Sequence, residues 1–85
     1  MEWTASLRRA IAYMEKHLLE PIDTNAVAKE AQLPSVSLQQ GFKIMTGYSL
    51  GEYIRFRRLY LAALDIMAGQ NRVIDLALKY GYETP

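Results

Sequence analysis

The side chains best suited to recognition chemistry in this chain are glutamine, valine and lysine, which gather within residues 35–46. Glutamine can pair bidentately with adenine, valine can contact a thymine methyl group, and lysine can contact a phosphate or a guanine. If these residues are helical, one stripe of the helix carries Val36, Gln39, Gln40 and Lys43. Such a stripe could read base edges in DNA, or it could be a solvated helix face that needs glutamine only for solubility.

A second group of candidate residues is basic. Arg55, Arg57 and Arg58 form the densest cluster of positive charge in the sequence. As phosphate contacts, they would fix the orientation of a duplex without reading its sequence. Alternatively, they could shield apolar surface with their aliphatic stems or pair with Glu52 and Asp65 on the same helix. The sequence leaves both interpretations of each arginine open.

The residues of an enzyme site are sparse. The chain has no cysteine and a single histidine, His17, which excludes a thiolate metal site and a Cys-His pair. His17 falls near the end of a predicted helix, where a favourable interaction with the helix terminus is its simplest role. Gly47 and Gly51 lack the Gly-Lys-Ser/Thr ending of a phosphate-binding loop. We therefore expect no catalysis, no metal and no cofactor.

Composition limits the classes of partner. Eighty-five residues allow one small domain, and 51% hydrophobic residues are enough for a core. No apolar run approaches the roughly 18 residues that a membrane span requires, so no membrane partner is expected. The absence of cysteine fits a reducing cytoplasm. Because the formal net charge is only +1, any case for nucleic acid must rest on where the basic residues lie.

The elements that would position these residues begin with two helices. Apolar residues recur at helical spacing over residues 4–18, and Pro21 ends this segment. A second, short helix should begin at Asp23 or Thr24, either of which can cap it.

The third helix should occupy residues 35–46, with Ser35 as its cap and Gly47 just past its end. Helix, brief turn and helix together make the helix-turn-helix pattern. Gly41 lies in the middle of the third helix, where glycine costs about 1 kcal/mol relative to alanine. We expect it to allow close packing against the second helix.

A long helix over residues 49–68 organises the chain. Ser49 and Glu52 are spaced as a capping box at its start, and Gly69 marks its end. At about 100° per residue, two apolar stripes run along it. The first stripe carries Leu50, Tyr53, Ile54, Leu61, Leu64 and Ala68, and the second carries Phe56, Leu59, Ala63, Ile66 and Met67. Because an ordinary surface helix has one stripe, we expect this helix to be buried on both sides.

A fifth helix is expected within residues 71–82. Its shared apolar face consists of Val73, Ile74, Ala77 and Tyr80. Its sequence resembles that of the second helix, which suggests a duplicated helix-turn-helix. Thr84 and Pro85 have the residue types of the cap and first position of a further helix.

These patterns together resemble a known family. Four segments, in this order, are similar to the DNA-binding domain of AraC/XylS-type transcription regulators: residues 38–43, 46–54, 57–59 and 74–84. The resemblance covers nearly the whole chain and implies an all-α fold in which the long helix joins two helix-turn-helix units. It also implies binding to promoter DNA, with one recognition helix from each unit entering the major groove.

Carried over by position, the resemblance implies base contacts by Val36, Gln39 and Gln40, and phosphate contacts by Ser35, Lys43, Arg55, Arg57 and Arg58. Gln40 stands where the family frequently has an arginine, so adenine rather than guanine is expected there. Pro34 stands where a capping serine is usual, so the start of the third helix could shift by one residue. Double-stranded DNA and RNA polymerase are the expected partners, and the cytoplasmic nucleoid is the expected location.

The resemblance divides the chain into a first helix-turn-helix unit at 1–47, a linker helix at 48–68 and the start of a second unit at 69–85. The second recognition helix is missing, so we expect the chain to be a fragment. Since apolar side chains worth roughly 1.5–3 kcal/mol each would lose their partners, we expect self-association through Phe56, Leu59 and the fifth helix, with Ile66 in the same contact. The alternative function is a helical protein–protein interaction module, in which aromatic side chains line a groove.

Overall fold

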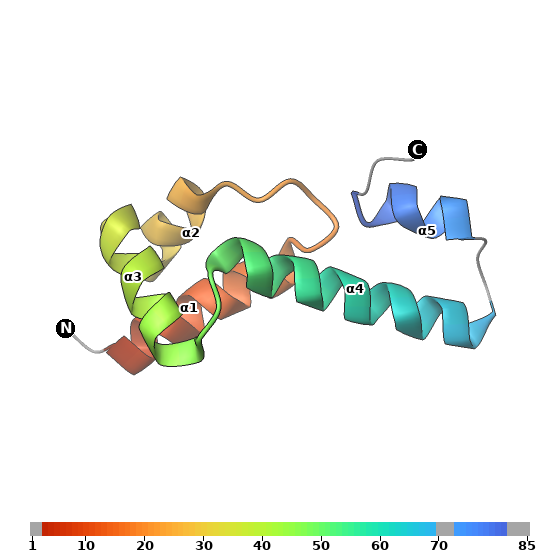
Figure 1. Ribbon diagram of the computed structural model, residues 1–85. Helices are drawn as coiled ribbons and strands as arrows, with labels where there is room; N and C mark the ends of the chain where they lie inside the picture. Colours follow the sequence, from red (N-terminus) through yellow and green to blue (C-terminus); the bar gives the residue numbers. More distant parts are fainter. Residues whose placement is uncertain (1–2, 70–72, 82–85) are drawn as a thin grey trace.

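The structure, a computed structural model, describes residues 3–69 and 73–81 (Figure 1). The described part of the chain is built from α-helices and contains no strand, so the predicted all-α fold class is confirmed. The helices are α1 (Trp3–Lys16), α2 (Thr24–Ala31), α3 (Ser35–Thr46), α4 (Leu50–Ala68) and α5 (Val73–Lys79).

The first three helices pack around a small apolar core. In Figure 1 they gather at one end of the molecule, α4 extends away from them, and α5 lies along the far half of α4. Met14 of α1, Val27 of α2, and Leu38 and Phe42 of α3 are completely buried. Because burial of each large apolar side chain contributes about 1.5–3 kcal/mol, this core stabilises α2 and α3 as a helix-turn-helix pair.

The ends of α2 and of α3 follow mostly from local chemistry. Asp23 caps α2, and its side chain accepts a hydrogen bond of 3.3 Å from the backbone N–H of Asn25. Gln32 ends α2 in the left-handed conformation, with φ of 61°. Gly47 ends α3 with φ of 82°, a conformation that glycine adopts without steric cost. The predicted end of the third helix is confirmed.

The prediction that Ser35 caps α3 is wrong. Pro34 occupies the cap position and makes no side-chain capping hydrogen bond, while Ser35 is the first residue of the helix. The proline ring fixes φ near the observed −58°, and the Pro34 carbonyl accepts the first helical hydrogen bond, from the N–H of Leu38 at 2.9 Å. The Ser35 hydroxyl is therefore free of the capping role and accepts a hydrogen bond from Gln39 at 3.1 Å.

The partner predicted for Gly41 is also wrong. The atoms nearest to the side of Gly41 that would carry a Cβ belong to the indole ring of Trp3 in α1, not to α2. Since Trp3 is the first residue of α1, the close approach is between the start of α1 and the middle of α3.

The capping box at the start of α4 is confirmed. The Ser49 hydroxyl accepts from the N–H of Glu52 at 3.1 Å, and the Glu52 carboxylate accepts from the N–H of Ser49 at 2.9 Å. Gly69 ends the helix in the left-handed conformation, with φ of 69°. These two signals fix the length of α4 at 19 residues.

The prediction that α4 is buried on both sides is wrong for this chain, whereas the expectation that one apolar stripe of α4 lacks partners is confirmed. Among the residues of α4, only Leu50 is buried. The second stripe is open to solvent: the exposed fractions are 44% for Phe56, 49% for Leu59, 51% for Ile66 and 82% for Met67. The reason is that α4 contacts α1 through Tyr53 and Arg57 and contacts the α5 segment through Asp65, and none of these residues belongs to this stripe. We call Phe56, Leu59, Ile66 and Met67 the exposed stripe of α4.

The fifth helix is confirmed and is tied to α4 by polar contacts. The buried Tyr80, just after α5, donates its hydroxyl to Asp65 at 2.6 Å, and the Lys79 ammonium lies 3.1 Å from the same carboxylate. Leu76 of α5 is buried as well. The side chains of Val73 and Ile74, and the predicted start of a further helix at 84–85, lie outside the described residues.

Candidate nucleic-acid interface

One side of α3 points into the core and another side points into solvent. Leu38 and Phe42 are completely buried, whereas Gln39, Gln40 and Lys43 are exposed and Val36 is 65% exposed. We call Val36, Gln39, Gln40 and Lys43 the recognition face. The structure thus brings the sequence-predicted base contacts together on one accessible side of the second helix of the helix-turn-helix pair.

Gln39 is held in place by its own helix. Its side-chain amide donates to the Ser35 hydroxyl at 3.1 Å, one helical turn earlier. A bidentate pair with adenine requires one amide N–H and the amide oxygen. The contact with Ser35 uses a single N–H, so Gln39 keeps the donor and the acceptor that an adenine needs. This arrangement lowers the entropy that the side chain would lose on binding.

Lys43 lies where α3 meets the start of α4. Its ammonium is 3.6 Å from the Glu52 carboxylate, and both side chains are well exposed. Hydrogen bonds from Ser49 chiefly, and then the charge of Lys43, hold the pKa of Glu52 below its usual value. An exposed pair of this kind is weak, so Lys43 can exchange its partner for a phosphate.

An open depression of about 440 Å³ adjoins the recognition face between α3 and the start of α4. Its lining consists of Gln39, Gln40, Lys43, Ile44 and Ser49. Ile44 is 82% exposed, so apolar surface borders the glutamine side chains. A mixed surface of this kind suits the base edges and methyl groups of a major groove.

Arg57 is not directed toward the recognition face. Its guanidinium donates to both oxygens of Glu15 in α1, at 2.9 Å each, and the Tyr53 hydroxyl donates to the same carboxylate at 2.8 Å. The hydrogen bond from Arg57 lowers the pKa of Glu15, and burial together with the Glu15 hydrogen bond raises the pKa of Tyr53 to about 12. This cluster joins α1 to α4.

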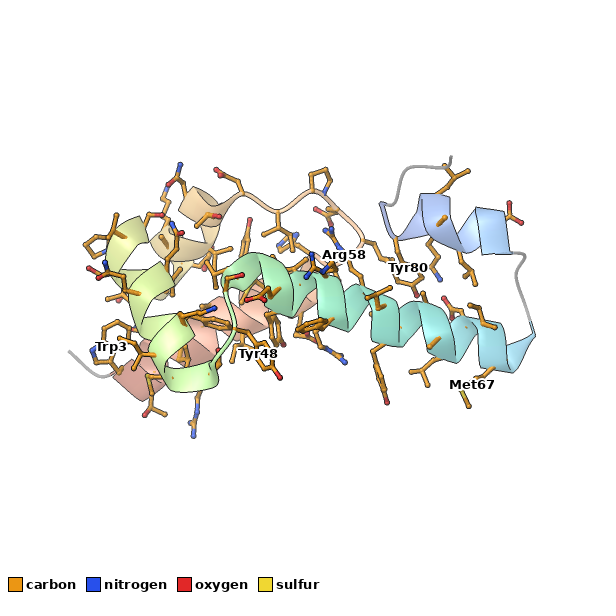
Figure 2. The ribbon with its side chains drawn as sticks, viewed as in Figure 1. Trp3, Tyr48, Arg58, Met67 and Tyr80 are labelled. Carbon is orange, nitrogen blue, oxygen red and sulfur yellow. The ribbon has the colours of Figure 1, made fainter. Side chains whose placement is uncertain are left out.

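Arg58 also has partners inside the molecule. It donates to the backbone carbonyls of Leu18, at 2.7 Å, and Glu20, at 2.6 Å, in the segment after α1 (Figure 2). These contacts satisfy carbonyl groups that no longer belong to a helix. Arg55 is exposed, and its guanidinium carbon lies 5.7 Å from the centre of the Phe56 ring. Arg55 and Arg58 line one depression beside α5, whereas Arg57 is held on Glu15 of α1, so the three linker arginines are divided between two sites.

Sequence reasoning missed the partner of Arg57. Glu15 precedes Arg57 by 42 residues, whereas the helical pairing rules used for the arginines reach only three or four residues along the chain. No local signal in the sequence joins the two. The pairing of an acidic residue late in the first helix with an arginine of the long helix could be found only once those helices were placed side by side.

Within residues 3–69 and 73–81, no group of three or more His, Cys, Asp or Glu side chains could hold a metal ion. Nor is any helix there long and apolar enough to cross a membrane. His17 lies just past the end of α1, with its Nδ1 at 3.1 Å from a Glu20 oxygen and its ring against Tyr13.

Comparison with known proteins identifies relatives over most of the chain. The chain is 36% identical over 72 residues to the regulatory protein SoxS of Escherichia coli. The matched region covers 85% of this chain and 67% of SoxS. The chain is 32% identical over 84 residues to the right origin-binding protein of Escherichia coli and to the transcriptional regulator Rob of Salmonella typhimurium. Those matches cover 99% of this chain and 29% of each relative. No family model matches the chain.

Proposed function

Because the chain belongs to the AraC/XylS family of DNA-binding transcription regulators, we propose that it reads DNA with the recognition face of α3. In this proposal α3 enters the major groove, which is about 12 Å wide and admits one helix. The observation that carries the proposal is that side chains on one side of α3 are buried while those on the other side are exposed. Leu38 and Phe42 are completely buried, and the opposite side of the same helix presents Val36, Gln39 and Gln40 to solvent.

Each side chain of the recognition face has a distinct proposed role. Gln39 pairs with an adenine, since its remaining N–H and oxygen match adenine N7 and N6. Gln40 also favours adenine, and Val36 contacts a thymine methyl group. We therefore propose a preference for A·T base pairs beneath α3.

Phosphate contacts are proposed for Ser35, Lys43 and Arg55, which lie at or near exposed surface. Contacts of these side chains with DNA phosphates would fix the position of α3 along the groove. We do not carry Arg57 and Arg58 into the interface, because both side chains are only partly exposed and both donate hydrogen bonds to α1 or to the segment after it. We retain a helix-turn-helix unit at 1–47, a linker at 48–68 and the start of a second unit at 69–85 as the proposed organisation.

The first test measures sequence preference. The chain selects a duplex from a randomised pool, and its affinity for that duplex is compared with its affinity for a shuffled duplex. Gln39→Ala should cost roughly 1–3 kcal/mol on the selected duplex and relax the preference at one position. If the variant binds both duplexes like the parent, Gln39 does not read bases.

The second test measures the electrostatic contribution. Reversing the charges of Lys43 and Arg55 to glutamate should weaken binding to both duplexes and reduce the salt slope by about 1 for each lost phosphate contact. Reversal of Arg8 and Lys16, two exposed residues of α1, makes the same change in net charge and is the matched control. Equal losses in the two double variants would show that net charge, not the interface, determines affinity.

The exposed stripe of α4 supports a second proposal, self-association of the chain. Phe56 is flanked by Tyr48, whose ring meets it edge-on with centroids 5.3 Å apart, so the apolar surface continues beyond α4. Contiguous exposed apolar surface usually marks an interaction site.

We also propose RNA polymerase as a partner of the regulator. The alternative function, a protein-interaction module, would use this stripe instead of α3.

A further inference from the structure

Trp3 and Gly41 make an unusually close contact between α1 and the recognition helix. A Cβ built on Gly41 would overlap Cη2 and Cζ3 of the Trp3 indole and would lie 3.2 Å from Cζ2. Real Cβ atoms do not approach other atoms so closely, so only glycine fits at this position while the ring stays in place. Figure 2 shows Trp3 at the start of α1 beside α3. The six-membered ring of the indole therefore rests directly on the backbone of α3.

The contact lies on the side of α3 that faces away from the recognition face. Residues two apart in a helix are separated by about 200° around its axis, so Gly41 lies roughly opposite Gln39 and Lys43. It is also distinct from the apolar core, because Leu38 and Phe42 are completely buried whereas Trp3 is 36% exposed. The indole thus packs against the side of α3 opposite the recognition face, at the edge of the core.

A glycine in the middle of a helix needs a compensating contact. It is conformationally freer than alanine in the unfolded chain and destabilises the helix. Gly41 has no positive φ that would require glycine, since it lies within regular α3 and is absent from the residues with left-handed backbone. Space for the Trp3 ring is the remaining reason for glycine that the structure supplies.

We propose that Trp3 is a positioning residue for DNA recognition: its ring, seated on Gly41, fixes how far α3 projects and how it is rotated about its axis. This inference rests on the proposed function of α3. A bidentate glutamine–adenine pair requires both hydrogen bonds to be short and nearly linear at once, so a small displacement of the helix weakens it. Phosphate contacts made by long flexible side chains tolerate the same displacement.

The proposal is tested with a double-mutant cycle of Trp3→Ala, Gly41→Ala and both together. Each variant is measured for its ratio of affinities for the selected and the shuffled duplex. Trp3 is the only tryptophan, so its fluorescence reports directly on the ring. Gly51→Ala is the matched control, because a Cβ at this exposed position of α4 would meet only Ser49 Oγ, at 4.0 Å.

Gly41→Ala should displace the ring, shift its emission to longer wavelength and reduce the affinity ratio by about fivefold or more, the lower end of what one bidentate base contact supplies. Trp3→Ala should reduce the ratio equally. The double variant should lose no more than either single variant, because all three lack the same contact. Gly51→Ala should behave like the parent, and circular dichroism should show α-helix in every variant.

The outcomes separate this inference from the proposed function. If the parent discriminates and Gly41→Ala shifts the emission but discriminates equally well, Trp3 does not position α3. Additive losses in the double variant would overturn the inference as well, since the two residues would then act independently. If the parent itself binds both duplexes equally and Gln39→Ala changes nothing, the proposed function fails, and the inference fails with it.

Discussion

Replacement of Arg57 by alanine should destabilise the protein by breaking the main polar connection between α1 and α4. The arginine makes two hydrogen bonds of 2.9 Å to Glu15, whose carboxylate also accepts from Tyr53. The pair is neither buried nor fully exposed, since 32% of the Arg57 side chain and 33% of the Glu15 side chain are accessible to solvent. The free energy that it contributes should therefore lie between that of a fully exposed ion pair and that of a charged hydrogen bond shielded from water.

The magnitude follows from those limits. Exposed ion pairs contribute about 0.2–1 kcal/mol, and hydrogen bonds to charged groups contribute about 1.5–3 kcal/mol when shielded from water. We expect a coupling free energy of about 1–2 kcal/mol between Arg57 and Glu15 in a cycle of Arg57→Ala, Glu15→Gln and both. For a domain of this size, each kcal/mol corresponds to a fall in Tm of about 4–8 °C.

The dependence on pH gives an independent reading of the same contact. Because the pKa of Glu15 is lowered in the folded protein, chiefly by its hydrogen bond with Arg57, the pair stabilises the fold above the ordinary carboxyl pKa of 4.5. This contribution is lost as the pH falls through the lower, folded pKa. Arg57→Ala should therefore lose less free energy of unfolding on acidification than the parent does.

The assay is urea unfolding followed by circular dichroism at neutral pH and over an acid series. Arg8→Ala, at an exposed position of α1, is the control and should leave the free energy of unfolding nearly unchanged. A coupling free energy near zero, or the same acid dependence in Arg57→Ala and the parent, would refute the reasoning. The arginine would then be held at the surface without stabilising the junction.

Three further perturbations address other parts of the molecule. Because the pKa of Tyr53 is raised from 10.0 to about 12 in the folded protein, its protonated hydroxyl stabilises the fold below pH 10. The free energy of unfolding should therefore fall as the pH rises from 10 toward 12. Tyr53→Phe should lack that fall when unfolding is measured over an alkaline pH series. Asp65→Asn should weaken the contacts of Lys79 and Tyr80, so hydrogen exchange should become faster in α5 and stay unchanged in α3. Phe56→Glu should suppress concentration-dependent light scattering; a parent that stays monomeric at high concentration would contradict self-association.

Helix ends were predictable because they depend on residues adjacent in sequence. The capping box of Ser49 and Glu52 joins groups three residues apart, and Gly47 adopts a backbone conformation that other residues avoid. Ser35 shows the limit of such rules. Ser35 has the residue type of a cap, but Pro34 takes the cap position because its fixed φ and its carbonyl already begin the helix.

Contacts between distant residues were not predictable from local patterns. Helical periodicity identifies which residues share a face, but it does not say whether another element covers that face. The second stripe of α4 illustrates this, because Phe56 and Met67 are apolar and regularly spaced and yet exposed. The same limitation hid Glu15 as the partner of Arg57, and Trp3 as the neighbour of Gly41.

The two missed contacts have one helix in common. At its first residue α1 places Trp3 on the backbone of α3, and one residue before its end it places Glu15 on Arg57 of α4. Helix α3, which is proposed to read bases, and helix α4 are thus both attached to α1, at its opposite ends. The two contacts lie about 18 Å apart along α1, since 12 residues separate Trp3 from Glu15 and each residue adds about 1.5 Å. Changes at sites more than about 7–10 Å apart that share no partner usually contribute independently. Loss of the Trp3 contact should therefore alter sequence preference with little effect on the α1–α4 junction, and loss of the Arg57 contact should do the reverse.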